Sequence, residues 1–193
     1  MQIQDHIETP TKQAFLLRPY QQRAVEWAKT GADGLIIAPA GCGKTVIASA
    51  IVKHYSSQFR NLHFGWLAPT RETCQQATDS LIAAGVDISR VEVRCPHESV
   101  DFSDKSMIIV DEAKHAPAAS WRKIIESCKG LRFGFDATPW CDDPERNEIL
   151  RKLFRDTQYE IKREELANVL AHANVYISTA TDIGLQQRID DQI

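Results

Sequence analysis

The apolar residues of this chain follow two patterns that alternate along the sequence. Short continuous apolar runs are bounded by Gly or Pro, and the first is 35–38, which reads L-I-I-A. Such runs are typical of strands buried on both faces of a parallel sheet. Between the runs lie longer segments with apolar residues at helical spacing, such as 44–54. Strands interleaved with helices predict an α/β fold, with a mostly parallel sheet covered by helices on both faces.

The same two patterns define the individual elements. The predicted strands are 35–38, 64–68, 91–94, 107–110 and 131–135. The predicted helices are 19–29, 44–54, 72–84 and a segment around 121–128. Beyond Pro139 the pattern weakens, and the prediction there is a loop at 141–147, a short helix at 148–154 and a strand at 157–161. Ligands of parallel sheets bind at the carboxyl ends of the strands, so the chemistry is expected in the loops that follow them.

Length and charge narrow the class of protein. At 193 residues, 43% of them hydrophobic, the chain can bury one good core and is short for two domains. The formal net charge is −3, so no overall basic field attracts nucleic acid, and any such contact must be local. Neither a signal peptide nor a bilayer-spanning apolar stretch is apparent, so we expect a cytoplasmic protein with no membrane partner.

The cysteines do not form a recognisable ligand pattern. They are five in number and widely spaced, with no C-x-x-C pair and no histidine at the spacing of a metal ligand. We therefore expect reduced thiols without a disulfide or zinc role. They are Cys42, Cys74, Cys95, Cys128 and Cys141.

A phosphate-binding loop is predicted at residues 38–45, which read A-P-A-G-C-G-K-T between a predicted strand and a predicted helix. Gly41 and Gly43 let the backbone curl so that its N–H groups point inward, toward the positive end of the helix. Lys44 can reach the β and γ phosphates of a nucleotide, and the Thr45 hydroxyl can ligate Mg²⁺. The alternative, a glycine turn with a solvated lysine, explains the strand–loop–helix context less well. The residues assigned to nucleotide binding here are Ala40, Gly41, Cys42, Gly43, Lys44, Thr45 and Val46, with no side-chain role for Cys42.

Two adjacent carboxylates follow the apolar run 107–110. Asp111 and Glu112 project in opposite directions if the strand continues, so one can hold Mg²⁺ while the other reaches the attacking water. An Asp-Glu pair alone is also a common start of a solvated loop, but the upstream phosphate loop favours the Walker B interpretation. The predicted catalytic residues are Lys44, Asp111 and Glu112, and the predicted metal ligands are Thr45 and Asp111.

Two segments bring a specific family resemblance. Residues 111–115 read D-E-A-K-H and resemble motif II of superfamily 2 DEAD/DEAH-box helicases and translocases. Residues 17–21, L-R-P-Y-Q, resemble the adenine-recognition motif of that family. The resemblance implies nucleotide contacts from Arg18 and Gln21, with the Gln21 amide pairing with the N6 and N7 edge of adenine.

Two further segments match the family in order. Residues 68–72, A-P-T-R-E, resemble motif Ia, which implies nucleic-acid contacts from Pro69, Thr70 and Arg71. Residues 135–140, F-D-A-T-P-W, resemble motif III, which implies that Asp136, Ala137 and Thr138 couple nucleotide state to the grip on nucleic acid.

The chain departs from the family pattern at two positions of the coupling machinery. Lys114 stands where motif II has His or Asp, and His115 follows one place later. Asp136 replaces the first hydroxyl of motif III. ATP binding is therefore a firmer expectation than ATP-driven unwinding.

The resemblance implies a RecA-like P-loop NTPase domain that uses ATP and Mg²⁺. We expect an N-terminal arm at 1–14, the RecA-like domain at 15–161, and at 162–193 an extension or linker toward an absent second domain. The implied partners are a second RecA-like domain in cis or trans, which supplies the arginine finger, and nucleic acid. DNA is favoured over RNA because the matched segments look closest to DNA-acting branches such as restriction-enzyme motor subunits and phage or repair helicases. The isolated chain is expected to be a weak ATPase without unwinding activity.

The sequence leaves two alternatives to a motor domain. A nucleotide-sensing interaction module would bind ATP and dock on a partner without catalysis. A small-molecule kinase is disfavoured because motifs Ia and III have no place in it.

Overall fold

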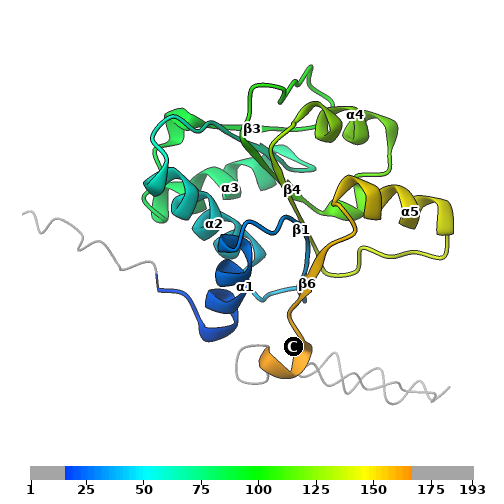
Figure 1. Ribbon diagram of the computed structural model, residues 1–193, viewed down its shortest axis with the longest axis horizontal. Helices are drawn as coiled ribbons and strands as arrows, with labels where there is room; N and C mark the ends of the chain where they lie inside the picture. Colours follow the sequence, from blue (N-terminus) through cyan, green and yellow to red (C-terminus); the bar gives the residue numbers. More distant parts are fainter. Residues whose placement is uncertain (1–15, 167–193) are drawn as a thin grey trace, which may run out of the picture.

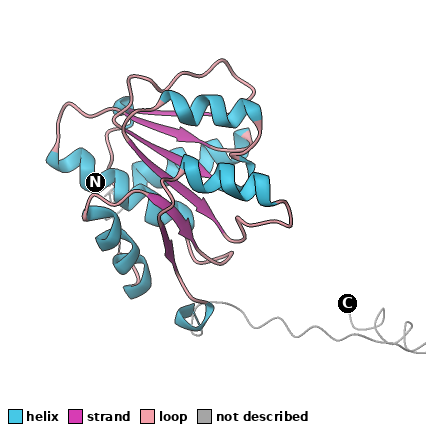
Figure 2. Ribbon diagram, turned by 45° about the vertical axis from the view of Figure 1, so that its right-hand side comes forward, coloured by secondary structure: helices cyan, strands magenta, loops and turns pink. Residues whose placement is uncertain are grey.

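A single parallel sheet with helices on both faces organises the protein (Figures 1 and 2). The computed structural model describes residues 16–166, so the expected arm at 1–14 and most of the expected extension at 162–193 lie outside the described residues. All strand pairs among the described residues are parallel, and the strand order is β3-β2-β4-β5-β1-β6. The strands are β1 (Gly34–Ile37), β2 (Phe64–Leu67), β3 (Val91–Arg94), β4 (Met107–Asp111), β5 (Leu131–Asp136) and β6 (Gln158–Glu160). This confirms the predicted α/β, RecA-like fold class.

The helices divide between the two faces of the sheet. One face is covered by α1 (Pro19–Lys29), α2 (Lys44–Gln58) and α3 (Arg71–Ala83), and the other by α4 (Ala119–Ser127) and α5 (Pro144–Leu153). Two separate hydrophobic clusters result, one under each helix layer. Successive residues of the strands enter opposite clusters, which explains why the strands read as unbroken apolar runs.

Strand β4 shows this arrangement residue by residue. Met107 and Ile109 lie in the cluster under α1, α2 and α3. Ile108 and Val110 lie in the cluster under α4 and α5. All four side chains are at most 1% exposed, so the sheet is fully covered at its centre.

The carboxyl ends of the central strands are level with one another. In the register of the sheet Ile37 of β1 lies beside Asp136 of β5, and Asp111 of β4 lies beside Phe135. A further hydrogen bond, from the Ala38 amide to the Asp136 carbonyl at 2.8 Å, extends this alignment into the loop after β1. The predicted functional residues in the loops after β1, β4 and β5 therefore lie at one edge of the sheet.

Three predicted boundaries are wrong. Helix α5 begins at Pro144, inside the segment predicted as a loop, because the Asp143 carboxylate accepts hydrogen bonds from the Glu145 and Arg146 amides and caps the helix. The apolar pattern failed there because α5 buries only Leu150 and Leu153. Helix α2 continues to Gln58 through polar residues, and β6 is shorter than predicted.

Residues beyond β6 still contact the domain. The chain makes a short 3-10 turn at Arg163–Leu166, and Leu166 is fully buried in the cluster under α1. Arg23 of α1 forms an ion pair with Glu165 of this turn. Within the described part of the chain, no helix is long and apolar enough to cross a membrane.

Candidate nucleotide-binding site

The phosphate loop connects β1 to α2 and depends on two glycines in left-handed backbone conformations. Gly41 has φ 77° and Gly43 has φ 84°. A Cβ atom at Gly43 would lie 2.7 Å from the Gln21 Nε2 atom, so glycine is needed there for space as well as for backbone conformation. No side chain caps the start of α2, which leaves its first amide groups available to an anion.

Side chains of helix α1 form hydrogen bonds that hold this loop in place. The Tyr20 hydroxyl and the Gln21 Nε2 atom both donate to the Cys42 carbonyl at 2.9 Å. The Gln21 Oε1 atom accepts from the Arg18 amide at 2.9 Å, and Gln21 is 5% exposed. Sequence reasoning gave Gln21 only an adenine contact and missed its role in holding the loop. An adenine contact must use the second N–H and the second lone pair of the same amide.

Cys42 serves the loop through its backbone. The side chain is 1% exposed, and burial raises the pKa of its thiol, with Lys44 acting in the opposite direction. A buried, protonated thiol is inert.

Asp111 ends β4, and the backbone turns sharply at Glu112, which has φ 52°. A left-handed conformation is uncommon for glutamate and stores strain. The Glu112 amide donates to the Asp111 Oδ1 atom at 3.1 Å, which stabilises the turn. The Glu112 carboxylate then meets the Lys114 Nζ atom at 2.7 Å, an ion pair that sequence reasoning did not foresee.

The two carboxylates differ in their electrostatic surroundings. Burial raises the pKa of Asp111, and the neighbouring charge of Glu112 raises it further. Burial also raises the pKa of Glu112, but the hydrogen bond and charge of Lys114, together with Lys44, outweigh burial and bring the pKa below its ordinary value. Asp136 adds a third negative charge close enough to act on Asp111. The three carboxylates thus influence one another at this edge of the sheet, and the charge of Lys44 acts in the opposite direction on Asp111.

Asp136 connects the loops at this edge of the sheet. The residue is 1% exposed; its Oδ2 atom accepts from the Lys114 amide at 2.8 Å, and its Oδ1 atom accepts from the Thr138 amide at 2.9 Å. Its backbone carbonyl accepts from Ala38, at the start of the phosphate loop. The carboxylate that departs from the motif III pattern thus ties the loop after β4 to the loop after β5. Ala137 is half-buried and Thr138 is exposed.

The segment predicted to contact nucleic acid follows β2, next to β4 in the sheet. Thr70 caps α3: its hydroxyl accepts from the Thr73 amide at 3.2 Å, and its own amide donates to the Thr73 hydroxyl at 3.0 Å. Pro69 is half-buried, and Arg71, the first residue of α3, is exposed. The segment therefore presents a helix start and an exposed arginine on the same edge as the phosphate loop.

A hollow of about 220 Å³ lies between the loops after β4 and β5. Its walls include Lys114, His115, Thr138, Trp140 and Arg146. The His115 ring packs against Trp121 at 5.6 Å between centroids, and the Trp140 ring carries the Arg151 guanidinium at 5.2 Å. Both aromatic side chains have packing partners, and Trp140 is still 37% exposed.

The expectation that no histidine lies near a cysteine is wrong. Cys95, His97 and Glu98 place their ligand atoms within 4.8 Å of one another, and the Cys74 Sγ atom lies 3.3 Å from that of Cys95. A tight turn brings His97 back to Cys95, and the packing of α3 beside β3 supplies Cys74. His97 stands two residues after Cys95 in the sequence, whereas linear spacing does not reveal the contact with Cys74.

A protein-family model described as an AAA domain matches residues 16–132, more than half of the chain. The chain belongs to the AAA domain family. Membership implies ATP binding, and the phosphate loop and its carboxylates lie within or beside the matched region.

Two curated proteins are similar to this AAA domain. A "51.5 kDa protein" of Lactococcus phage (isolate 7-9) is 32% identical over 111 residues, which cover 55% of the chain and 24% of that protein. The "Putative DNA 3'-5' helicase Rad25" of Halobacterium salinarum is 26% identical over 155 residues, which cover 69% of the chain and 25% of that protein. The chain thus spans about a quarter of the length of these relatives.

Solved structures share the fold at low sequence identity. The Pyrococcus furiosus Hef helicase domain has a TM-score of 0.61 and 22% identity, over 75% of this chain and 38% of that one. The UvsW helicase of bacteriophage T4 has a TM-score of 0.60 and 16% identity, over 75% of this chain and 60% of that one. The Sulfolobus solfataricus SWI2/SNF2 ATPase core was solved in complex with double-stranded DNA. It has a TM-score of 0.58 and 13% identity, over 80% of this chain and 47% of that one. The AAA domain therefore shares the RecA-like fold of these helicase and ATPase domains.

Proposed function

We propose that this AAA domain is the ATP-binding motor domain of an ATP-dependent nucleic-acid helicase or translocase. It hydrolyses ATP with Mg²⁺ when a second RecA-like domain completes the site. The observation that carries the proposal is the meeting of the phosphate loop, the Asp111-Glu112 pair and Asp136 on adjacent strands, at level carboxyl ends. An isolated glycine turn or an isolated acidic pair would not require this arrangement.

Each residue of the site has a distinct role in the proposal. Lys44 and the loop amides bind the β and γ phosphates, and Thr45 and Asp111 hold Mg²⁺. When bound, Mg²⁺ neutralises charge on the phosphate oxygens. Glu112 orients the attacking water and accepts its proton. Arg18 and Gln21 select adenine, and the loop residues Ala40, Cys42 and Val46 contribute backbone contacts.

Lys114 regulates access to Glu112 in this account. Its ammonium group is paired with the Glu112 carboxylate, which must contact the attacking water during hydrolysis. Its amide is held by Asp136, at the junction of the two coupling loops. A shift of that junction on nucleic-acid binding would move Lys114 and release Glu112, which gives Asp136, Ala137 and Thr138 a physical means of coupling.

The nucleic-acid partner is proposed to contact Pro69, Thr70 and Arg71. An exposed arginine at a helix start suits a phosphate of the backbone. DNA is favoured over RNA because a similar protein is described as a DNA helicase and a fold neighbour was solved with double-stranded DNA. The proposed domain at 15–161 is extended by the turn Arg163–Leu166, whose Leu166 is buried in the core, and the segment after that turn would lead to the second domain.

The Lys114–Glu112 ion pair also favours a second candidate, a nucleotide-sensing module without catalysis. With the Glu112 carboxylate paired to Lys114, ATP could bind and report its presence to a partner without being hydrolysed. Turnover separates the two candidates, because only a motor domain gains ATPase activity from nucleic acid and a second domain.

The test compares three forms of the 193-residue chain. Binding is measured with a fluorescent ATP analogue and Mg²⁺, and hydrolysis is measured with single-stranded DNA and a second RecA-like domain supplied in trans. Lys44→Ala should abolish binding, because it removes the cation aimed at the phosphates. Glu112→Gln should bind normally and stop hydrolysis, because an amide cannot accept the proton. Hydrolysis by Glu112→Gln at the parental rate would refute the catalytic role of Glu112. Binding by Lys44→Ala with the parental affinity would mean that the loop is only a turn and does not bind phosphate.

A further inference from the structure

Four side chains that can ligate a metal meet at the carboxyl end of the edge strand β3. Cys74 comes from the first turns of α3, and Cys95 directly follows β3. His97 and Glu98 belong to a turn closed by a hydrogen bond from the Glu98 amide to the Cys95 carbonyl at 3.2 Å. The two sulfur atoms are 3.3 Å apart, and the ligand atoms of Cys95, His97 and Glu98 lie within 4.8 Å of one another.

We propose that Cys74, Cys95, His97 and Glu98 bind one Zn²⁺ ion. Ligand atoms around a tetrahedral zinc stand about 3.3 to 3.8 Å apart, as follows from bond lengths of about 2.0 to 2.3 Å. The ligand atoms of Cys95, His97 and Glu98 therefore need a contraction of no more than about 1.5 Å, and the Cys74 sulfur, which already contacts that of Cys95, must move closer to this group to complete the tetrahedron. Two thiolates and an imidazole select zinc over Mg²⁺ or Ca²⁺, which prefer oxygen ligands.

The thiol chemistry requires the cation to displace protons. Burial raises the pKa of the Cys74 thiol to about 12, and its hydrogen bond with Cys95 contributes in the same direction. Zinc is bound by thiolates, so one proton leaves each cysteine for solvent as its sulfur–metal bond forms. The positive charge of the metal compensates the new thiolates in this half-buried position.

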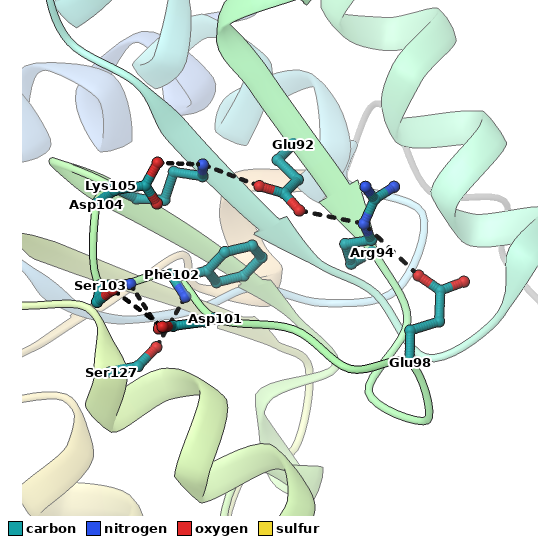
Figure 3. A network of polar contacts seen from close by, with 9 residues as sticks. All are labelled: Glu92, Arg94, Glu98, Asp101, Phe102, Ser103, Asp104, Lys105 and Ser127. Atoms are coloured by element: carbon teal, nitrogen blue, oxygen red, sulfur yellow. Dashed lines mark hydrogen bonds and ion pairs between the residues drawn. The ribbon is translucent and has the colours of Figure 1, made fainter.

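Glu98 is available as the fourth ligand. Figure 3 shows Glu98 reaching toward Arg94, with the Glu98 Oε2 and Arg94 Nε atoms 3.8 Å apart. Arg94 has a closer partner in Glu92, at 3.2 Å, and Glu92 also accepts from Lys105 at 2.9 Å. Moving the Glu98 carboxylate onto a metal therefore leaves no charge of this network without a partner.

A disulfide between Cys74 and Cys95 is the competing interpretation. Their sulfur separation of 3.3 Å is well beyond the bonded distance of about 2.05 Å. A disulfide would also give His97 and Glu98 no function in the cluster. The convergence of four different ligand groups favours the metal.

The ion would act structurally, because protein groups fill all four tetrahedral positions. It would join the turn after β3 to the beginning of α3, where Thr70 and Arg71 are located. The Ala68 amide already donates to the Arg94 carbonyl at 3.0 Å, so the two segments are neighbours on the backbone as well. Zinc binding does not depend on the proposed motor function, and its test needs neither ATP nor nucleic acid.

The experiment titrates Co²⁺, a spectroscopic substitute for zinc, into the reduced 193-residue chain in excess Mg²⁺. Excess Mg²⁺ saturates oxygen-rich sites such as the one at Asp111. A thiolate-to-cobalt charge-transfer band that saturates at about one equivalent, and that Zn²⁺ abolishes, is the expected result. Cys74→Ser and His97→Ala should each weaken Co²⁺ binding by more than about 100-fold, the upper end of what losing an outer-sphere partner costs.

Matched variants complete the design. Cys141→Ser and His63→Ala replace exposed residues outside the cluster and should leave the titration unchanged. His97 is exposed, so its replacement is compatible with folding, and circular dichroism verifies that. The proposal is overturned by the absence of a thiolate band, by a band that survives in folded His97→Ala and Cys74→Ser, or by conversion of Cys74 and Cys95 to a disulfide that oxidant forms equally well with Zn²⁺ present.

Discussion

Glu112 occupies the most constrained position in the candidate site. Its backbone is left-handed, its amide is bonded to the preceding aspartate, and its carboxylate is paired with Lys114 two residues later. The strain at Glu112 is offset by these contacts, which also direct the side chain away from an extended strand conformation. A lysine at 114 thus alters the residue that is proposed to handle the proton.

Removing Lys114 should raise the basal ATPase rate. Lys114→Met frees the Glu112 carboxylate, and an ion pair this exposed is worth at most about 1 kcal/mol, or about fivefold in rate. Steady-state ATPase of the 193-residue chain without DNA is the measurement. Lys29→Met is the matched control, because Lys29 is also an exposed lysine paired with a glutamate, but on α1. A loss of activity in Lys114→Met with normal ATP binding would mean that Lys114 assists hydrolysis instead of restraining it.

At the scale of elements, the site depends on how the loops after β4 and β5 are joined. Asp136 accepts hydrogen bonds from the amides of Lys114 and Thr138 and is buried between them. Both acceptors belong to one carboxylate, so the two loops cannot move independently while these bonds last. The loops share the hollow lined by His115, Thr138 and Arg146, so their separation also sets its shape.

Asp136→Asn should destabilise the protein and weaken Mg²⁺-ATP binding. An asparagine amide presents one acceptor and one donor, so one backbone N–H is left facing another donor, at a cost of about 1–3 kcal/mol. Urea denaturation and nucleotide titration measure the two effects. Asp143→Asn is the control: that carboxylate also accepts from two amides, but it is exposed and caps a helix, where Asn serves as well as Asp. Equal stability of the two variants would contradict the linking role of Asp136.

At the scale of the whole molecule, the proposed function makes this domain one half of a bipartite active site. Lys44 approaches a bound nucleotide from the P-loop side, and the opposite side is open to a second domain in the proposed function. Of the arginines after Pro139, Arg155 pairs with Asp33 and donates to the Gly130 carbonyl, at the amino edge of the sheet. Arg146 lines the hollow beside Lys114 and is the better placed to reach the site from within the chain.

The isolated chain should bind ATP, hydrolyse it slowly and leave duplex DNA intact. A finger arginine is worth about 10³ to 10⁵ in rate, so its supply by a second domain should dominate turnover. The measurement is steady-state ATPase with and without single-stranded and duplex DNA, followed by addition of a second RecA-like domain in trans. Fast DNA-stimulated turnover by the chain alone would contradict the two-domain proposal, and Arg146→Ala would then test for an internal finger, with Arg151→Ala as its control.

Local sequence patterns determined the elements and the loops that carry the chemistry. The apolar runs, the helical spacing and the G-K-T and D-E segments each act over a few residues, and the backbone responds over the same range. A mostly parallel sheet and the expectation of ligands at its carboxyl ends then follow from general rules of α/β folds, whereas the strand order came from the structure. The RecA-like fold, which the family resemblance implied, was confirmed.

Contacts between distant residues were decided only by the tertiary structure. The Gln21 amide reaches Cys42 because α1 packs on α2, and Cys74 meets Cys95 because α3 packs beside β3. The Lys114–Glu112 pair depends on a left-handed turn that no local pattern predicts. The start of helix α5 was predicted too late because capping by Asp143, and not an apolar stripe, sets it. Side-chain partners of this kind depend on the direction in which each packed element points its residues, and that direction is settled only when the sheet and both helix layers assemble around a common core.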